Sequence, residues 1–241
     1  MILKLTLEYD GTGFSGWARQ PGKRTVELVV REALDAVFPR WEGLAVAGRT
    51  DAGVHATGQA ASADVDGGPP ADRAAQALNA VLPGDVAVVR AEPAPSGFHA
   101  RFSARSRSYR YRVLARRTPS PLEERRALWW PRPVDATALA AAAALLAGEH
   151  DFRAFTPTET HHDVFTRHVR EASWKREGDH LDFTVTADSF LRHMVRTLVG
   201  TMLELGPEAP GRMEQLLDGA SRDEAGLTAP PWGLYLERVE Y

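Results

Sequence analysis

The chain has 241 residues, of which 44% are hydrophobic and 25% are charged, and its formal net charge is −3 at pH 7. These values are typical of a globular protein and exclude a disordered chain, a collagen-like fibre and a strongly basic tail. There is no cysteine, which excludes disulfides, thiolate metal sites and cysteine nucleophiles. No signal-peptide pattern and no apolar run of about 18 residues is present, so we expect a cytoplasmic protein without a membrane span.

Strand and helix patterns alternate along the whole chain. Alternation of apolar and polar residues predicts strands at 2–9, 41–47, 55–65, 86–92, 106–114, 165–176, 180–187 and 234–241. Helical spacing of apolar residues predicts helices at 26–37, 71–82, from 136 to near Gly148, and from Ser189 to 205. Thr25, Asp135 and Ser189 are the expected caps at the start of three helices, and Gly206 is expected to end the last one.

Both halves of the chain contain this mixture of strands and helices. We therefore expect an α+β fold with two similar halves, each a mostly antiparallel sheet backed by helices. The expected division is a domain at 1–105 and a second domain at 106–241.

Basic residues gather in one part of the chain. Nine arginines lie between His99 and Arg126, where the acids are Glu123 and Glu124. A basic stretch in a nearly neutral protein can hold an anionic polymer locally. The same run of arginines is explained equally well if their side chains lie on the solvent-exposed face of a strand.

One loop of the chain combines residue types that can carry chemistry. The sequence has no phosphate-binding P-loop, no dinucleotide-binding glycine motif and no nucleophile elbow, and the adjacent His161 and His162 lack metal-ligand spacing. We therefore expect no cofactor and no metal. The loop 48–55, GRTDAGVH, places a cation, a hydroxyl and a carboxylate between glycines after a predicted strand. Catalytic groups concentrate on such loops, although an Asp-Ala-Gly turn is also an ordinary structural turn.

The segment AGRTDAGVHATGQ at 47–59 resembles the signature of the tRNA pseudouridine synthase A family. Further blocks resemble the family in the same order: YDGTGFSGW at 9–17, LNAVLPGDVAV at 78–88, FHARFSARSRSYRYRV at 98–113, FLRHMVRTLVG at 190–200 and GLYL at 233–236. The resemblance covers nearly the whole chain. The chain departs from the family pattern at Ala18, at Glu27 and at Thr197, where asparagine is usual.

The resemblance implies isomerisation of uridine to pseudouridine in the anticodon stem-loop of tRNA, at positions 38 to 40. The N1–C1′ bond breaks, the base turns, and C5 rejoins the sugar, without redox change or cofactor. Asp51 matches the catalytic aspartate of the family, and a carboxylate suits chemistry at an electron-poor sugar carbon. Attack on the sugar, attack on C6 of the base and removal of the 2′ proton remain open. The resemblance also implies a homodimer with one tRNA across both subunits.

The same resemblance assigns partners to Asp51. Arg196 would pair with it and keep the carboxylate ionised, and Arg49 would contact the target nucleotide and hold it out of the stack. Helical spacing places Arg196 and Gly200 on one face of the last helix, and Gly200 would let that face approach a neighbour closely. A surface arginine is the alternative explanation of Arg196.

The strand at 106–114 carries the expected base-binding residues. Tyr109 matches the active-site tyrosine of the family, which packs on uracil, and Leu234 would line the base pocket. Arg110 lies on the opposite strand face from Tyr109, and we assign it to substrate binding. The arginine-rich stretch 101–126 would hold phosphates around a central basic cleft between the two sheets.

Two other functions fit the residues. A non-catalytic RNA-binding module would keep its whole function without Asp51. A carboxylate-dependent nucleoside or glycoside hydrolase would release free uracil, and would normally use a second acid that the Asp51 loop does not supply.

Overall fold

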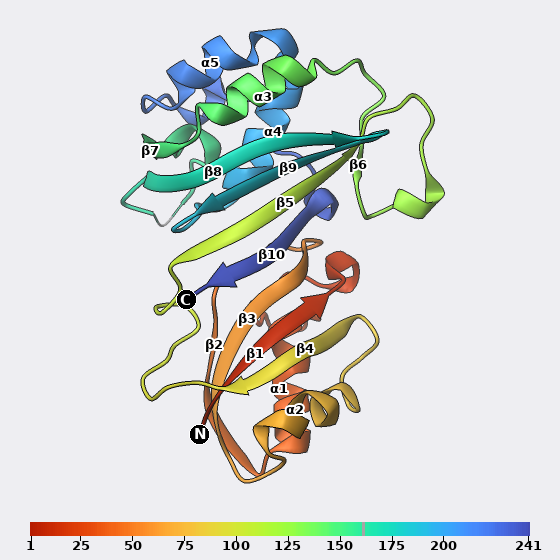
Figure 1. The fold of residues 1–241 in the computed structure, drawn as a ribbon, viewed down its shortest axis with the longest axis vertical. Coiled ribbons are helices and arrows are strands. Elements are labelled where there is room, and N and C mark those ends of the chain that lie inside the picture. Colours follow the sequence, from red (N-terminus) through yellow and green to blue (C-terminus); the bar gives the residue numbers. More distant parts are fainter. Residues whose placement is uncertain (161) are drawn as a thin grey trace. The chain divides into compact units, whose positions relative to one another are not determined.

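The chain folds into two compact units. A computed structural model describes residues 1–160 and 162–241, so His161 lies outside the described residues. One unit contains residues 1–107 and 235–241, and the other contains residues 108–234. Both units combine helices with mostly antiparallel strands, which is the expected α+β class (Figure 1). The last strand is grouped with the first unit, and the domain ranges 1–105 and 106–241 stay a prediction.

The first unit is built on a sheet with the order β4-β1-β3-β10, in which β2 also pairs with β3. Its strands are β1 (Ile2–Tyr9), β2 (Arg40–Val46), β3 (His55–Asp66), β4 (Val86–Pro93) and β10 (Leu234–Glu240). The strand β3 pairs antiparallel with β1 and β2 and parallel with β10. β10 pairs with residues 55–56 and β2 with residues 61–66, so the two strands share one edge of β3.

The core of the first unit lies between this sheet and the helices α1 (Val26–Val37) and α2 (Ala71–Asn79) (Figure 1). Alternation along β1 buries three leucines completely: Leu3, Leu5 and Leu7. The predicted stripe of α1 is buried as well, and the Thr25 hydroxyl accepts a hydrogen bond from the backbone N–H of Leu28 at 3.4 Å. Burying one such leucine contributes about 1.5–3 kcal/mol, so these two elements hold the sheet in place.

The second unit has a sheet with the order β5-β9-β8-β7, and β6 pairs with β5. Its strands are β5 (Ser106–Leu114), β6 (Leu128–Trp129), β7 (Gly148–Asp151), β8 (Thr166–Glu177) and β9 (His180–Ala187). The helices α3 (Ala136–Ala144), α4 (Met194–Leu205) and α5 (Ala209–Leu216) pack together, and α3 lies against β8. β8 and β9 form the predicted antiparallel hairpin, whose turn contains Gly178 at φ +61°.

The predicted strands are confirmed with small shifts at their ends, whereas three helix boundaries were wrong. The second helix ends at Asn79, and the alanine-rich helix ends at Ala144 because Gly148 already begins β7. Ser189 does not cap the last helix, which begins only at Met194. The residue before it, His193, has φ +62°, and this left-handed backbone interrupts a right-handed helix. The elements β6, β7 and α5 were not predicted.

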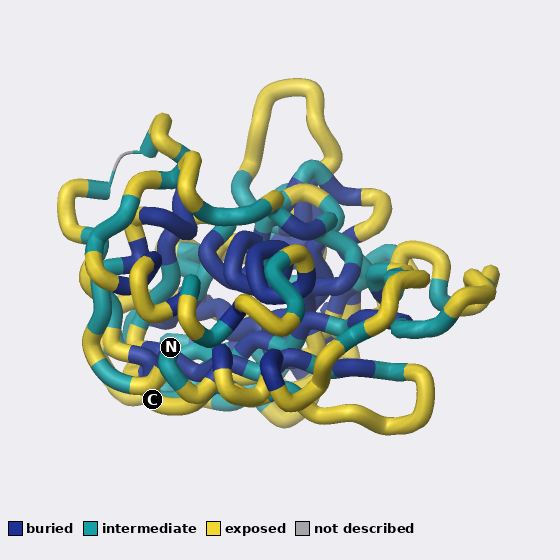
Figure 2. Tube along the Cα trace, turned by 90° about the horizontal axis from the view of Figure 1, so that it is seen from above, coloured by how far each residue is buried: buried dark blue, intermediate teal, exposed yellow. Residues whose placement is uncertain are grey.

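Burial follows these elements. Buried residues gather in strands and helices, and exposed residues gather in connecting loops such as 19–24 and 117–119 (Figure 2). In the described part of the chain, none of the helices is both long and apolar enough to cross a bilayer.

Candidate functional site

Asp51 lies on the loop between β2 and β3, in the first unit. Along this loop Arg49 is exposed, Thr50 is buried and Asp51 is half-buried. Alternating burial is what an extended backbone gives, since successive side chains point to opposite sides. Arg49 and Asp51 therefore share the side of the loop that faces away from the core.

A glycine-rich segment at 10–17 packs directly on the Asp51 loop. The backbone N–H of Trp17 donates to the carbonyl of Thr50 at 3.0 Å. Gly16 has φ +87°, and a Cβ at this position would lie 2.8 Å from the same carbonyl oxygen. Glycine is needed here for both its conformation and its lack of a side chain.

Gly11 makes the same kind of contact at the other end of the loop. A Cβ on Gly11 would lie 2.0 Å from the carbonyl oxygen of Val54, which no side chain tolerates. The segments 9–17 and 47–59, which are far apart in sequence, therefore pack with their backbones in direct contact on both sides of Asp51.

Buried side chains of β1 and β3 form hydrogen bonds to the Asp51 loop. The hydroxyl groups of Tyr9 and Thr50 lie 2.8 Å apart, and the Gln59 amide donates to the Tyr9 hydroxyl at 3.2 Å and to the Gly48 carbonyl at 2.7 Å. Burial raises the pKa of Tyr9 to about 12, although its hydrogen bonds to Thr50 and Gln59 act in the opposite direction. The phenol is therefore neutral at physiological pH. The network fixes the residues on both sides of Arg49.

Tyr9 and Gln59 were not predicted as site residues. The available signal was a polar group at a position that the strand pattern buries. A buried polar group has to find a partner, and here the partners lie on the Asp51 loop.

His55 closes the loop against the last strand. Its Nδ1 lies 3.1 Å from the backbone N–H of Gly11 and also 3.1 Å from an Asp10 carboxylate oxygen. The Gly11 N–H donates to Nδ1, and the Asp10 carboxylate lies beside the same nitrogen, so His55 connects the segment 10–11 to the end of the Asp51 loop. The His55 ring stacks on Tyr235 with the ring centroids 4.7 Å apart.

In the second unit, Tyr109 and Arg110 lie on opposite faces of β5, as the alternation predicts. Tyr109 is buried and makes an edge-to-face contact with Phe190 at 4.9 Å between ring centroids. The guanidinium of Arg110 lies 3.4 Å from a carboxylate oxygen of Asp182. The next aromatic residue on the Tyr109 face, Tyr111, is buried, and burial raises its pKa.

Arg196 lies on α4, where a close backbone approach holds its side chain. Its Nε donates to the carbonyl of Ala229 at 2.8 Å, and the Ala229 N–H donates back to the Arg196 carbonyl at 3.0 Å. One turn further along, a Cβ on Gly200 would lie 1.9 Å from the carbonyl oxygen of Leu227. The predicted close approach at Gly200 is confirmed, and the neighbour is the segment 226–230.

Thr197, one of the departures from the family pattern, also faces this segment. It is completely buried, and its hydroxyl lies 3.0 Å from the hydroxyl of Thr228. The Thr228 hydroxyl also accepts a hydrogen bond from Arg222 at 3.1 Å. A threonine at 197 therefore still links α4 to the segment 226–230.

The predicted site residues divide between the two units. Arg49 and Asp51 share one loop of the first unit, and the other four lie in the second unit: Tyr109, Arg110, Arg196 and Leu234. Leu234 is buried at the start of β10, with 6% of its surface exposed. The Asp51–Arg196 pair stays a prediction.

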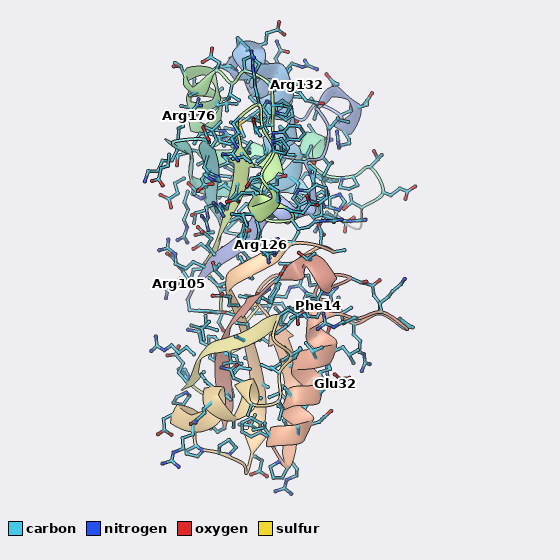
Figure 3. All side chains as sticks on the ribbon, turned by 90° about the vertical axis from the view of Figure 1, so that its right-hand side faces the viewer. Phe14, Glu32, Arg105, Arg126, Arg132 and Arg176 are labelled. Atoms are coloured by element: carbon cyan, nitrogen blue, oxygen red, sulfur yellow. The ribbon has the colours of Figure 1, made fainter. Side chains whose placement is uncertain are left out.

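The arginine-rich stretch contains two kinds of side chain. Arg107 binds backbone carbonyls, and Arg116 lies 3.3 Å from Asp179. Four others are exposed: Arg101, Arg105, Arg117 and Arg125. Figure 3 labels Arg105 and two more basic side chains nearby in sequence, Arg126 and Arg132. The exposed members are the ones that remain accessible to an anionic partner.

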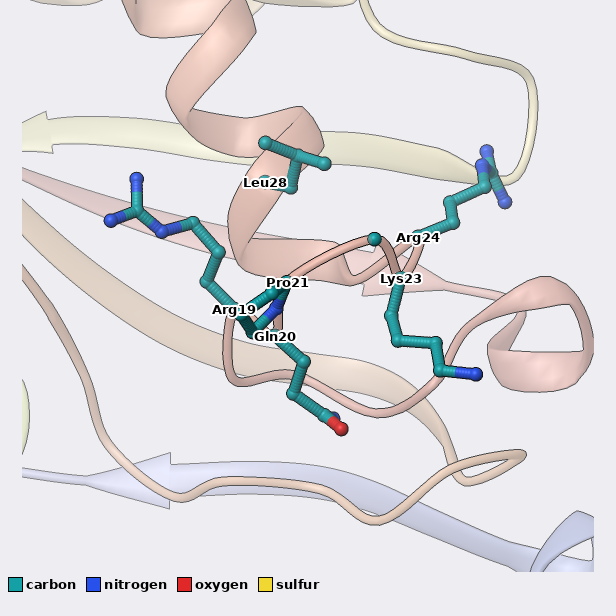
Figure 4. A pocket seen from close by; sticks show the side chains of 7 residues that line it. Arg19, Gln20, Pro21, Lys23, Arg24 and Leu28 are labelled. Atoms are coloured by element: carbon teal, nitrogen blue, oxygen red, sulfur yellow. The ribbon is translucent and has the colours of Figure 1, made fainter.

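A shallow basic pocket lies on the first unit, formed by the loop 19–24 and by Leu28 of α1 (Figure 4). Arg24 makes two hydrogen bonds to Asp85, at 2.7 and 2.8 Å, and its guanidinium lies 4.0 Å from the centre of the Phe14 ring. None of its lining residues is a predicted site residue. Across 1–160 and 162–241, no group of three or more His, Asp or Glu side chains is placed to hold a metal ion.

Comparison with known proteins gives a consistent result over the full chain. The family model described as tRNA pseudouridine synthase matches residues 6–103 and 142–241. The chain is similar to the tRNA pseudouridine synthase A of Moorella thermoacetica, with 42% identity over 99% of both chains. It is also similar to the protein of that name from Bacillus subtilis, with 40% identity over 100% of this chain and 99% of the relative. A chain of the crystal structure of a Cbf5-Nop10-Gar1 complex aligns over 98% of this chain and 58% of its own, with 13% identity and a TM-score of 0.36.

Proposed function

We propose that this chain, which belongs to the tRNA pseudouridine synthase family, isomerises uridine to pseudouridine in the anticodon stem-loop of tRNA, at positions 38 to 40. The observation that carries the proposal is the geometry of the Asp51 loop. Asp51 is half-buried two residues after the exposed Arg49, on a loop whose backbone Gly11 and Gly16 approach closely.

The reaction is balanced without an added reagent. The C1′–N1 bond of uridine breaks, a C1′–C5 bond forms, C5 loses its proton, and N1 gains one. The product is an isomer of the substrate, so the enzyme needs no oxidant and no energy source. The Asp51 carboxylate acts on the sugar carbon, on C6 of the base or on the 2′ proton, and each of these roles needs it ionised.

The remaining site residues bind and orient the nucleotide in this proposal. Arg196 pairs with Asp51, and the hydrogen bond from its Nε to the Ala229 carbonyl supports this role by fixing the guanidinium. Arg49 braces the space that the flipped nucleotide leaves. Tyr109 packs on the uracil, and its edge-to-face contact with Phe190 supports a fixed ring. Leu234 lines the base pocket.

The wider arrangement is also part of the proposal. Two similar halves, with their sheets joined around a basic cleft, would present the site to the tRNA. Arg110 and the exposed arginines of the stretch 101–126 would hold phosphates, so tRNA affinity should fall steeply with salt. The protein would act in the cytoplasm as a homodimer, with one tRNA lying across both subunits and with no cofactor.

The test is incubation of the purified protein with unmodified tRNA, without cofactors, followed by nucleoside analysis. We expect pseudouridine from the wild type and none from Asp51→Asn, while the tRNA affinity of the variant stays within a few-fold. Asp72→Asn, at an exposed carboxylate on α2, is the matched control and should keep full activity. Release of free uracil would identify a hydrolase instead, and binding without any product would identify an RNA-binding module.

A further inference from the structure

One aromatic side chain of the first unit is exposed although its position is fixed. Phe102 has 77% of its surface exposed. Its ring stacks on His99 with the centroids 4.4 Å apart and the planes at 27°. The Nδ1 of His99 accepts the backbone N–H groups of Arg101 and Phe102, at 3.2 and 3.3 Å. The two rings are therefore held together, and the outer one faces solvent.

This stack is tied to the start of the Asp51 loop. Arg107 donates from Nη2 to the carbonyls of Arg101 at 2.8 Å and Ala47 at 2.9 Å, and from Nε to Ala47 at 3.2 Å. On the other side, the Tyr241 hydroxyl donates to the carbonyl of Ala100 at 3.0 Å. These hydrogen bonds connect the loop that carries the stack to the last strand and to Ala47, the residue before the Asp51 loop.

Positive charge accompanies the stack. The Arg101 guanidinium lies 5.7 Å from the centre of the Phe102 ring. Arg101 and Arg105 are both exposed. Exposed aromatic rings next to arginines are how proteins bind unpaired nucleotides, because the ring takes the base and the cation takes the phosphate.

We propose that the Phe102–His99 stack is a platform on which an unpaired base of the RNA substrate stacks, with Arg101 on an adjacent phosphate. The inference rests on the proposed function, since it assigns this surface to the same RNA. The occupant is a loop nucleotide rather than a duplex, because only an unpaired base exposes its whole face to a ring. The loop that carries the platform is linked through Arg107 to Ala47, which precedes the Asp51 loop, so platform and loop belong to the same unit.

The experiment measures binding of an anticodon stem-loop RNA that carries 2-aminopurine at single loop positions. Phe102→Ala should weaken binding by about 5- to 150-fold, which is the range for loss of one base–aromatic stack. It should also abolish the quenching of one 2-aminopurine position. Phe102→Trp should restore both signals. In pseudouridine formation, Phe102→Ala should raise the KM for this RNA by a similar factor, and Phe102→Trp should restore it.

Val89→Ala is the matched control, since Val89 is an apolar residue of the same unit with 59% of its surface exposed. It should leave RNA affinity unchanged. Wild-type affinity for the Phe102→Ala variant would overturn the proposal, and so would a change in oligomeric mass with unchanged RNA affinity, which would mark Phe102 as a protein contact. Phe102-dependent binding by a wild type that forms no pseudouridine would support the platform and reject the proposed activity.

Discussion

Replacing Gly200 by alanine should destabilise this protein, although helix propensity predicts the opposite. Gly200 lies inside α4, where alanine is normally better than glycine by about 0.8–1.0 kcal/mol. Here the new Cβ would lie 1.9 Å from the carbonyl oxygen of Leu227. An ordinary contact begins at 3.4 Å, so the segment 226–230 has to retreat by about 1.5 Å.

The retreat has a cost that can be estimated. Overpacking of this kind costs about 1–3 kcal/mol. The two hydrogen bonds between Arg196 and Ala229, at 2.8 and 3.0 Å, would also be stretched, and each contributes about 0.5–1.5 kcal/mol. After the gain in helix propensity, we expect a net loss of about 2 kcal/mol. For a chain of this size, that corresponds to a fall of about 4–8 °C in Tm.

Differential scanning calorimetry of the Gly200→Ala variant tests this estimate. Gly211→Ala is the matched control, because Gly211 lies in α5 and a Cβ there meets nothing within 4 Å. The control should be stabilised, by up to about 1 kcal/mol. If Gly200→Ala melts at or above the wild-type temperature, the close approach of α4 to the segment 226–230 is wrong.

Two further substitutions test the first unit. Tyr9→Phe removes the buried hydroxyl that contacts Thr50, so the free energy of unfolding in a urea titration should fall by about 1–3 kcal/mol. Pseudouridine formation should be slower and RNA affinity unchanged. Wild-type stability of the variant would contradict the network. Asp85→Asn should cost less than about 1 kcal/mol at pH 7, because Asp85 and its partner Arg24 are both partly exposed. The hydrogen bond from Arg24 lowers the pKa of Asp85 below 3.8, so its contribution is complete above that pH and is lost as the pH falls further. The melting temperatures of variant and wild type should therefore converge in acid, and a constant difference down to pH 2 would refute this assignment.

Some residues of the candidate site could be predicted from the chemistry of a short stretch of sequence, and others could not. The Asp51 loop stood out because a cation, a hydroxyl and a carboxylate lie between glycines, and in the structure Arg49 is exposed, Thr50 is buried and Asp51 is half-buried. Tyr9 and Gln59 did not stand out, because nothing within either strand shows that its polar group meets the Asp51 loop.

The start of α4 was not predicted correctly from the local sequence pattern. Ser189 has the chemistry of a cap, but α4 begins at Met194 after a left-handed His193. Residues other than glycine are uncommon in that conformation, and the neighbouring sequence does not indicate it. By contrast, Thr25 and Asp135 do cap their helices, because each accepts a hydrogen bond from a backbone N–H only three residues away.

The sequence by itself determined the strands, most helix starts, the membership in a family and the loop that carries Asp51. These features depend on periodicity, on caps and on motifs that lie within one stretch of chain. Only the tertiary structure decided that Gly11 and Gly16 clamp the Asp51 loop, that Gly200 meets the Leu227 carbonyl, and that Phe102 stays exposed on a fixed ring. The two glycine contacts join segments that are far apart in sequence, and the exposure of Phe102 depends on what the rest of the fold leaves uncovered, so all three are set by tertiary packing.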